Sequence, residues 1–176
     1  MKKILNLSLL MIVMFSISCK KNSNDEKIEI DTNNLTTCPK DFNCTYLYHD
    51  AADFGEPFFL NLKKGSYKVF KYSALLGYGN YAKYVYMRIP MNVTQFSLTN
   101  KQVLAGEVKF ANPCTSCNTI GVKIVGGSFK GIKTSTSFGV PKWLLDGQLY
   151  LGSITPSAYR DTIRIKQYFT LDPTGI

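Results

Sequence analysis

The sequence predicts an all-β protein, with an antiparallel β-sandwich as the expected architecture and a small β-barrel as the runner-up. From residue 58 onward, apolar and polar residues alternate in about eight or nine strand-length runs, the pattern of strands with one buried face. Turn-forming residues separate these runs at intervals of about 8 to 15 residues. Beyond residue 18, no segment carries an apolar stripe of helical spacing over about ten residues, which excludes a helical bundle.

The segment 38–56 precedes the alternating region and contains two cysteines close together. We expect it to form a small cysteine-stapled element followed by a loop. Within it, the alternation over 46–49 predicts a brief strand, and 51–54 is expected to form a helical turn before Pro57.

The strands expected in the first half of the domain differ in how clearly their faces are defined. The run at 66–73 changes its apolar face between Val69 and Phe70, which predicts either a bulge or burial on both sides. Pro90 ends the third run or confines it to a sheet edge. The expected strands lie at 58–62, 66–73, 81–89, 93–98 and 103–110.

The second half of the domain repeats the pattern. The pair Gly126-Gly127 interrupts the alternation, so we expect the runs at 120–125 and 128–134 to pair as a hairpin. A further strand is expected at 141–152. The last strand, 162–171, is expected to face inward with Ile163, Ile165, Phe169 and Leu171, and outward with Thr162, Arg164, Lys166 and Tyr168.

The first eighteen residues have the order of an export signal. Lys2 and Lys3 form a short positive region, the segment 4–17 is mainly apolar, and the small residue Ser18 precedes Cys19. The apolar run is shorter than the roughly 20 residues that a transmembrane helix needs. We therefore expect residues 1–18 to be a cleaved signal peptide.

The residues around the cleavage point, SISCKK at 16–21, resemble the lipobox of bacterial lipoproteins, in the looser form common in Bacteroidota-type bacteria. The resemblance implies that Cys19 becomes the acylated first residue. It also implies a lipid-anchored protein of the bacterial cell envelope, at the outer membrane in its periplasmic or surface-facing leaflet. In that group, acidic residues after the cysteine direct export to the cell surface, and Asn24-Asp25-Glu26 lies at about that place.

Composition predicts the domain organisation. The segment 19–37 begins with the lipidated cysteine and continues as a polar, Asn-rich stretch without aromatic residues, which predicts a flexible tether. Residues 38–176 are long enough for one domain with its own core. The arrangement as a whole resembles the small β-rich lipoproteins of the same bacterial group.

The formal charge of the chain is +9, yet its basic residues are scattered between strands rather than gathered in a block. The scatter favours a solvated lysine face, and anionic lipid headgroups or acidic polysaccharides are the partners that such a charge would attract. Nucleic acid is not expected as a partner, because the chain has neither a basic helix nor an RNP-like run.

The four cysteines of the domain are an even number in an oxidising compartment, so disulfides are expected. Two local bridges, Cys38–Cys44 and Cys114–Cys117, are favoured, and cross-pairing between the two pairs remains an alternative. A four-cysteine zinc site is disfavoured because the first spacing is wide and the compartment favours oxidation. We predict no metal and no cofactor.

Catalytic patterns are weak. His49 is the single histidine and has no Gly-x-Ser-x-Gly element to accompany it. A glycoside hydrolase needs two carboxylates that face each other across a cleft. Nothing in the spacing selects a pair among Glu56, Glu107, Asp146 and Asp161. We therefore predict no catalytic residue.

Ligand binding has better support in the sequence. Tyr78 and Tyr81 lie in a Gly-rich link between two strands and are candidates for stacking on sugar rings, the alternative being that they lie back on the sheet. Arg88, on the outward face of its strand, is a candidate for an acidic ligand, the alternative being that it keeps an exposed strand from pairing with other chains. Asp161-Thr162-Ile163 resembles the motif that Bacteroidota-type bacteria O-glycosylate, which makes Thr162 a candidate.

These observations favour a non-catalytic binding module of the envelope, with a glycan or an envelope protein as its ligand. The alternatives are a polysaccharide-acting hydrolase and a structural or inhibitory component of an envelope assembly.

Overall fold

The computed structural model describes residues 27–55, 61–77, 81–113, 121–153 and 160–176, and it confirms the all-β prediction. One short helical segment, α2 (Asn100–Gln102) with the π-helical turn η2 (Val103–Glu107), connects two strands. The strands are β1 (Phe42–Phe54), β2 (Leu62–Lys64), β3 (Tyr67–Leu76), β4 (Ala82–Pro90), β5 (Gln95–Leu98), β6 (Val108–Ala111), β7 (Val122–Ser135), β8 (Pro141–Ser153) and β9 (Arg160–Leu171). No helix in the described ranges is long and apolar enough to cross a membrane.

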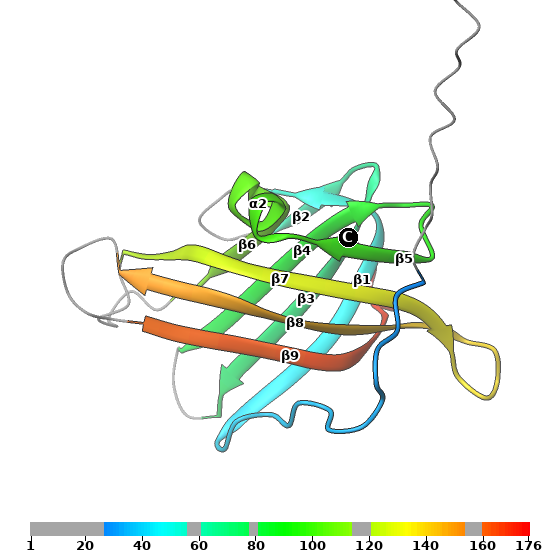
Figure 1. The fold of residues 1–176 in the computed structure, drawn as a ribbon, viewed down its shortest axis with the longest axis horizontal. Coiled ribbons are helices and arrows are strands. Elements are labelled where there is room, and N and C mark those ends of the chain that lie inside the picture. Colours follow the sequence, from blue (N-terminus) through cyan, green and yellow to red (C-terminus); the bar gives the residue numbers. More distant parts are fainter. Residues whose placement is uncertain (1–26, 56–60, 78–80, 114–120, 154–159) are drawn as a thin grey trace, which may run out of the picture.

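The strands form one sheet that curls into a half-barrel, in the order β5-β7-β8-β9-β1-β3-β4-β6, with β2 added beside β1. Figure 1 shows β7, β8 and β9 crossing in front of β3 and β4. A single curled sheet therefore takes the place of the two separate sheets of the expected sandwich, and the half-barrel is nearer to the small β-barrel that was the runner-up. Neighbouring strands are antiparallel, except that β1 and β9 pair in parallel at Leu47–Tyr48 and Thr170–Leu171.

The main core fills the concave side of the sheet, between its two halves. Its centre is Phe70 on β3, whose ring lies 5.4–6.0 Å from four other aromatic rings. Trp143 on β8 is 1% exposed in the same cluster. The rings around Phe70 are those of Tyr48, Phe96, Trp143 and Phe169.

The strand β3 is buried on both faces, as its change of apolar face predicted. Phe70 belongs to the main core, whereas Val69 packs on the convex side with Ala52, Phe54 and Tyr86. The register between β3 and β4 runs without a shift, so burial on both sides, and not a bulge, explains the pattern.

The strand expected at 46–49 is present but is much longer, and the helical turn expected at 51–54 is wrong. Residues 42–54 form the single strand β1, which lies near the centre of the sheet between β3 and β9. A bulge between His49 and Ala52 places Ala51 at a positive φ of 52°. Hydrogen bonding to neighbours along the strand outweighs the weak local signal of a helical turn.

The expected hairpin turn at Gly126-Gly127 is also corrected. These two glycines lie inside β7, where the register with β8 shifts between Ile124 and Gly126. A β-bulge thus takes the place of a turn, and both runs pair with β8 rather than with each other. The side chain of Asn100 on α2 accepts a hydrogen bond from the Gly127 amide at 2.9 Å. The amide at the bulge therefore has a hydrogen-bond partner outside β8.

The strand expected at 103–110 begins only at Val108. Thr99 and Gln102 form a reciprocal capping box that starts the short helical segment. Val103 turns its side chain into the core, and Gly106 ends the turn at a φ of 97°. The apolar residue Val103, at the start of the expected strand, is therefore buried by a helical turn and not by a strand.

The second half of the predicted tether is held against the sheet. Ile30 is buried, and Thr36 exchanges two hydrogen bonds of 2.8 Å with Lys166 on β9. The segment finds hydrogen-bond partners on β9 because β1 pairs with β9 only at Thr170 and Leu171, near the C-terminal end of β9. The prediction of a flexible tether from polar composition is therefore wrong for residues 27–37. Residues 19–26 lie outside the described ranges.

The predicted Cys38–Cys44 disulfide is present, with the two Cα atoms 5.7 Å apart. It ties the end of the N-terminal segment to the beginning of β1. Cys114 and Cys117 lie outside the described residues, so their pairing stays a prediction.

Candidate functional site

Arg88, the residue expected to meet an acidic ligand, is already bound within the protein. Its Nη1 donates to Asp53 at 2.9 Å, and its Nε donates to Glu107 at 3.0 Å. The guanidinium also lies over the rings of Phe54 and Tyr67, at 5.1 and 4.6 Å from their centroids. The hydrogen bonds to Glu107 and Asp53 hold the pKa of Arg88 above its ordinary value. Arg88 thus joins β1, β4 and η2.

The tyrosine loop is only partly described. Tyr81 is half-buried, and its ring packs edge-on against that of Phe42, 6.0 Å between centroids. This contact corresponds to the alternative in which the tyrosine lies back on the sheet. Tyr78 lies outside the described residues.

The two predicted modification sites are Thr162 and Cys19. Thr162 is exposed on β9 and faces outward, so its glycosylation stays a prediction. Cys19 lies outside the described residues.

The carboxylates considered for hydrolysis are engaged by basic side chains. A general acid and a second carboxylate would have to face each other across a cleft. Instead, Glu107 pairs with Arg88, Asp146 with Lys130 at 3.8 Å, and Asp161 with Lys83 at 2.7 Å. Glu56 lies outside the described residues. The described part of the chain holds no group of three or more His, Cys, Asp or Glu side chains arranged to bind a metal.

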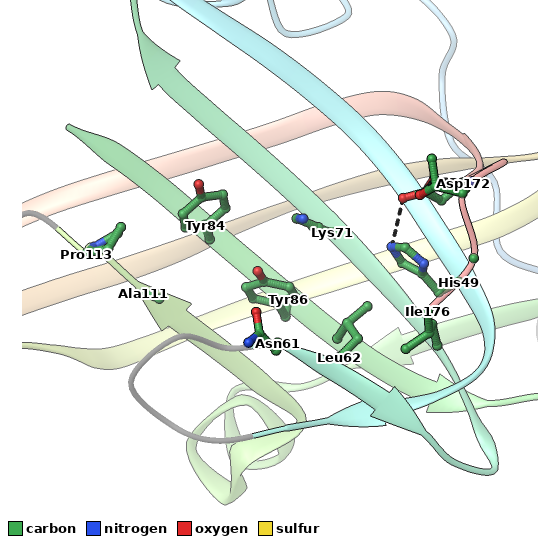
Figure 2. A pocket seen from close by; sticks show the side chains of 12 residues that line it. His49, Asn61, Leu62, Lys71, Tyr84, Tyr86, Ala111, Pro113, Asp172 and Ile176 are labelled. Atoms are coloured by element: carbon green, nitrogen blue, oxygen red, sulfur yellow. Dashed lines mark hydrogen bonds and ion pairs between the residues drawn. The ribbon is translucent and has the colours of Figure 1, made fainter. Parts of the chain in front are cut away.

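A groove of about 570 Å³ lies on the convex face of the sheet, and we call it the tyrosine groove. Figure 2 shows the side chains of Lys71, Tyr84 and Tyr86 on its floor, with the C-terminal residues 172–176 at one end. The floor follows from strand pairing, because Lys71 on β3 stands opposite Tyr86 on β4. Tyr84 and Tyr86 share a face because alternate residues of a strand do.

The floor of the groove combines aromatic surface with a positive charge. The rings of Tyr84 and Tyr86 lie 6.2 Å apart at 35°, and Tyr86 is almost wholly buried. Burial, with a smaller effect from Tyr84, raises the pKa of Tyr86 to about 12, so its phenol stays protonated. The Lys71 ammonium lies 5.7 Å from the Tyr84 ring centroid, and no carboxylate of the described residues lies within ion-pairing distance of it.

One end of the groove is closed by His49 and Asp172, whose Nε2 and Oδ2 atoms lie 3.4 Å apart. Two hydrogen bonds from Thr174 hold the pKa of Asp172 below its ordinary value. Burial, together with the Lys71 charge, lowers the pKa of His49 against the opposing effect of Asp172. His49 is 6% exposed and both its ring nitrogens are buried, so neither can reach a ligand in the groove. The pair is a structural contact of the C-terminal segment with β1.

The lowered pKa of His49 predicts a loss of stability in mild acid. Below the unfolded value of about 6.5, the unfolded chain binds a proton that the folded chain does not, so the free energy of unfolding falls as the pH drops through this range. Urea midpoints between pH 7.5 and 5.0 measure the slope. His49→Gln removes the titrating group, so its slope should be flatter than that of the wild type. Equal slopes would contradict the assignment, and Asp172 titrates only at lower pH.

The residues of the groove were not singled out by the sequence. The alternation of Tyr84, Tyr86 and Arg88 on one strand face was the available signal, but it does not show that Lys71 stands beside them. Comparison with protein-family models, with curated proteins and with solved structures found no match.

Proposed function

We propose that this protein is a non-catalytic, glycan-binding lipoprotein of the bacterial cell envelope, and that the tyrosine groove holds the glycan. The observation that carries the binding proposal is the partly exposed Tyr84 ring beside the Lys71 ammonium in an open groove. The cellular location rests on the lipobox-like residues around Cys19.

The chemistry of the groove suits a sugar. Sugar rings present apolar C–H faces that stack on aromatic rings, and hydroxyl groups that exchange hydrogen bonds with polar side chains. Tyr84 supplies the aromatic face, while Asn61 and Lys71 supply polar groups at the rim and the floor. The groove volume of about 570 Å³ falls within the usual range of small-molecule sites.

Replacing Tyr84 by Ala is expected to weaken glycan binding at least about tenfold, because the stacking surface is lost. Isothermal titration with the envelope or dietary polysaccharide selected on a glycan array measures the affinity. Tyr150→Ala is the matched control, because Tyr150 is also exposed but lies on β8, away from the groove. Failure of the wild type to bind any such polysaccharide, or an equal loss in Tyr150→Ala, would contradict the proposal. Capture of an envelope protein that depends on Tyr84 would favour a protein ligand instead.

The lipid anchor is tested separately. Intact-mass analysis of protein from its native host is expected to show a chain that begins at Cys19 and carries fatty acyl groups. Cys19→Ala should release the protein from washed membranes, because acyl chains contribute about 0.8 kcal/mol per buried methylene. An unacylated Cys19, or a chain that still carries residues 1–18, would contradict the proposed lipid anchor.

A further inference from the structure

The hairpin between β7 and β8 extends away from the body of the half-barrel (Figure 1, yellow). Its turn is defined by hydrogen bonds: the Thr136 amide donates to the Val140 carbonyl, and the Gly139 amide donates to the Thr136 carbonyl, both at 2.9 Å. Gly139 has a φ of 76°. These features match the three-residue hairpin loop that ends with a glycine in the left-handed region. The tip therefore has a preorganised shape.

This hydrogen-bonded tip displays apolar side chains to solvent. Phe138 is 93% exposed and Val140 is 54% exposed. A lone exposed apolar residue is ordinary, but Phe138, the most exposed large apolar residue of the described chain, lies at the end of a projecting, hydrogen-bonded turn.

The charged residues of the hairpin segment itself have one sign. The segment 131–145 contains two lysines and no Asp or Glu. Lys133 is exposed on β7, and Lys142 lies on β8 with its ammonium 3.8 Å from the centroid of the Tyr168 ring. An apolar tip with basic residues behind it complements an anionic membrane surface, in which apolar side chains enter the acyl boundary and lysines stay among the headgroups.

We propose that the β7–β8 hairpin is a membrane-inserting element, in which Phe138 and Val140 enter the interface of an anionic bilayer and Lys133 and Lys142 contact its headgroups. It gives the domain a second contact with the membrane, beyond the lipid. This two-anchor arrangement rests on the proposed acylation of Cys19, whereas insertion of the hairpin does not.

The beginning of the described chain lies near enough for both anchors to reach one bilayer. The Ile28 amide donates to the Gln95 side chain at 3.0 Å, and Gln95 pairs with Ile132 on β7. Phe138 follows Ile132 by six residues, about 20 Å along a strand. The eight Cα–Cα steps from Cys19 to residue 27 span up to about 28 Å in a fully extended chain. Figure 1 shows the described N-terminal segment (blue) beginning on the side of the hairpin.

The single tryptophan of the chain makes a direct test possible, because Trp143 is buried in the core. Phe138→Trp places a fluorescent probe at the tip, in the chain from residue 19 with Cys19→Ser so that no acyl group contributes. With vesicles of phosphatidylglycerol and phosphatidylcholine, the emission of this variant should shift to shorter wavelength and be quenched by brominated acyl chains. The wild-type Trp143 emission should not change.

Sedimentation with the same vesicles measures affinity. Phe138→Ser with Val140→Ser should reduce partitioning by about tenfold or more, and Lys133→Gln with Lys142→Gln should reduce it on anionic but not on neutral vesicles. Leu104→Ser is the control, because Leu104 is apolar and about as exposed as Val140 but lies on η2. No spectral shift with anionic vesicles, or equal losses in the control, would overturn the proposal. Acylation of Cys19 is measured by intact-mass analysis and insertion of the hairpin by vesicle binding, so failure of the lipid anchor and failure of the hairpin are distinguishable.

Discussion

Phe70→Ala is expected to lower the free energy of unfolding by about 3–5 kcal/mol. The Phe70 ring is fully buried, and it contacts rings from β1, β5, β8 and β9. Its removal leaves a cavity between the two halves of the curled sheet, where neighbours on separate strands cannot easily collapse together.

Urea unfolding followed by the fluorescence of Trp143 measures this loss, because the two rings lie 5.4 Å apart. A domain with about 5–15 kcal/mol of stability can lose its folded state through this change, so Phe70→Leu is the companion variant, with an expected cost of about 1–2 kcal/mol. Phe138→Ala should lie within about 0.5 kcal/mol of the wild type, since Phe138 has almost no contacts to lose. A cost below about 1 kcal/mol for Phe70→Ala would show that Phe70 is not the centre of the core.

The second large effect is expected from Asp50→Asn, because it leaves an ammonium without its counter-charge in the core. Lys68 is 6% exposed, its Nζ lies 4.6 Å from the centroid of the Tyr48 ring, and its ion-pair partner is Asp50. Removing one member of a buried ion pair costs about 3–5 kcal/mol. Asp50 is itself half-exposed, so water screens the pair and we expect about 2–3 kcal/mol.

A second substitution separates charge from packing. Lys68→Met keeps an unbranched chain of similar length and removes the ammonium, so its effect should be within about 1 kcal/mol of neutral. In the Lys68→Met background, Asp50→Asn should cost no more than about 0.5 kcal/mol. A double-mutant cycle by urea unfolding gives the coupling energy. If Asp50→Asn costs the same in both backgrounds, the ion pair does not stabilise the fold.

The fold class was predictable because strand alternation is a local property. A strand with one face on a core must place apolar residues at every second position, whatever its neighbours are. The inward face predicted for Ile163, Ile165 and Phe169 is therefore confirmed, because all three residues are buried. The two-sided burial of Val69 and Phe70 was also readable from the sequence, as was the local Cys38–Cys44 bridge, whose residues are close in the chain.

The errors arose where a local signal has two structural meanings. A Gly-Gly pair serves equally as a turn or as a bulge, and only the continuous pairing with β8 decides for the bulge. Apolar residues at 103–110 suit a strand or a buried helical turn, and the capping box at Thr99 decides between them. Leu171 continues the alternation of β9 but lies at its exposed end.

The tyrosine groove could not be derived from the sequence, because its parts come from strands whose pairing is long-range. Lys71 meets Tyr86 through the register of β3 with β4, and Asp172 reaches His49 through the parallel contact of β9 with β1. The assignment of Arg88 to a ligand had the same weakness, since the strand face was right but its partners Asp53 and Glu107 lie on other elements.

By itself, the sequence determined that this chain is all-β and that its strands have defined faces, and it predicts a lipoprotein signal at residues 1–19. Each of these is written in residues near one another in the chain. The tertiary structure alone decided that one curled sheet encloses the core, which charged side chains form ion pairs within the protein, and where a groove remains open to a ligand. Those outcomes depend on strand order and register, which are set by the packing of the whole core rather than by any one segment.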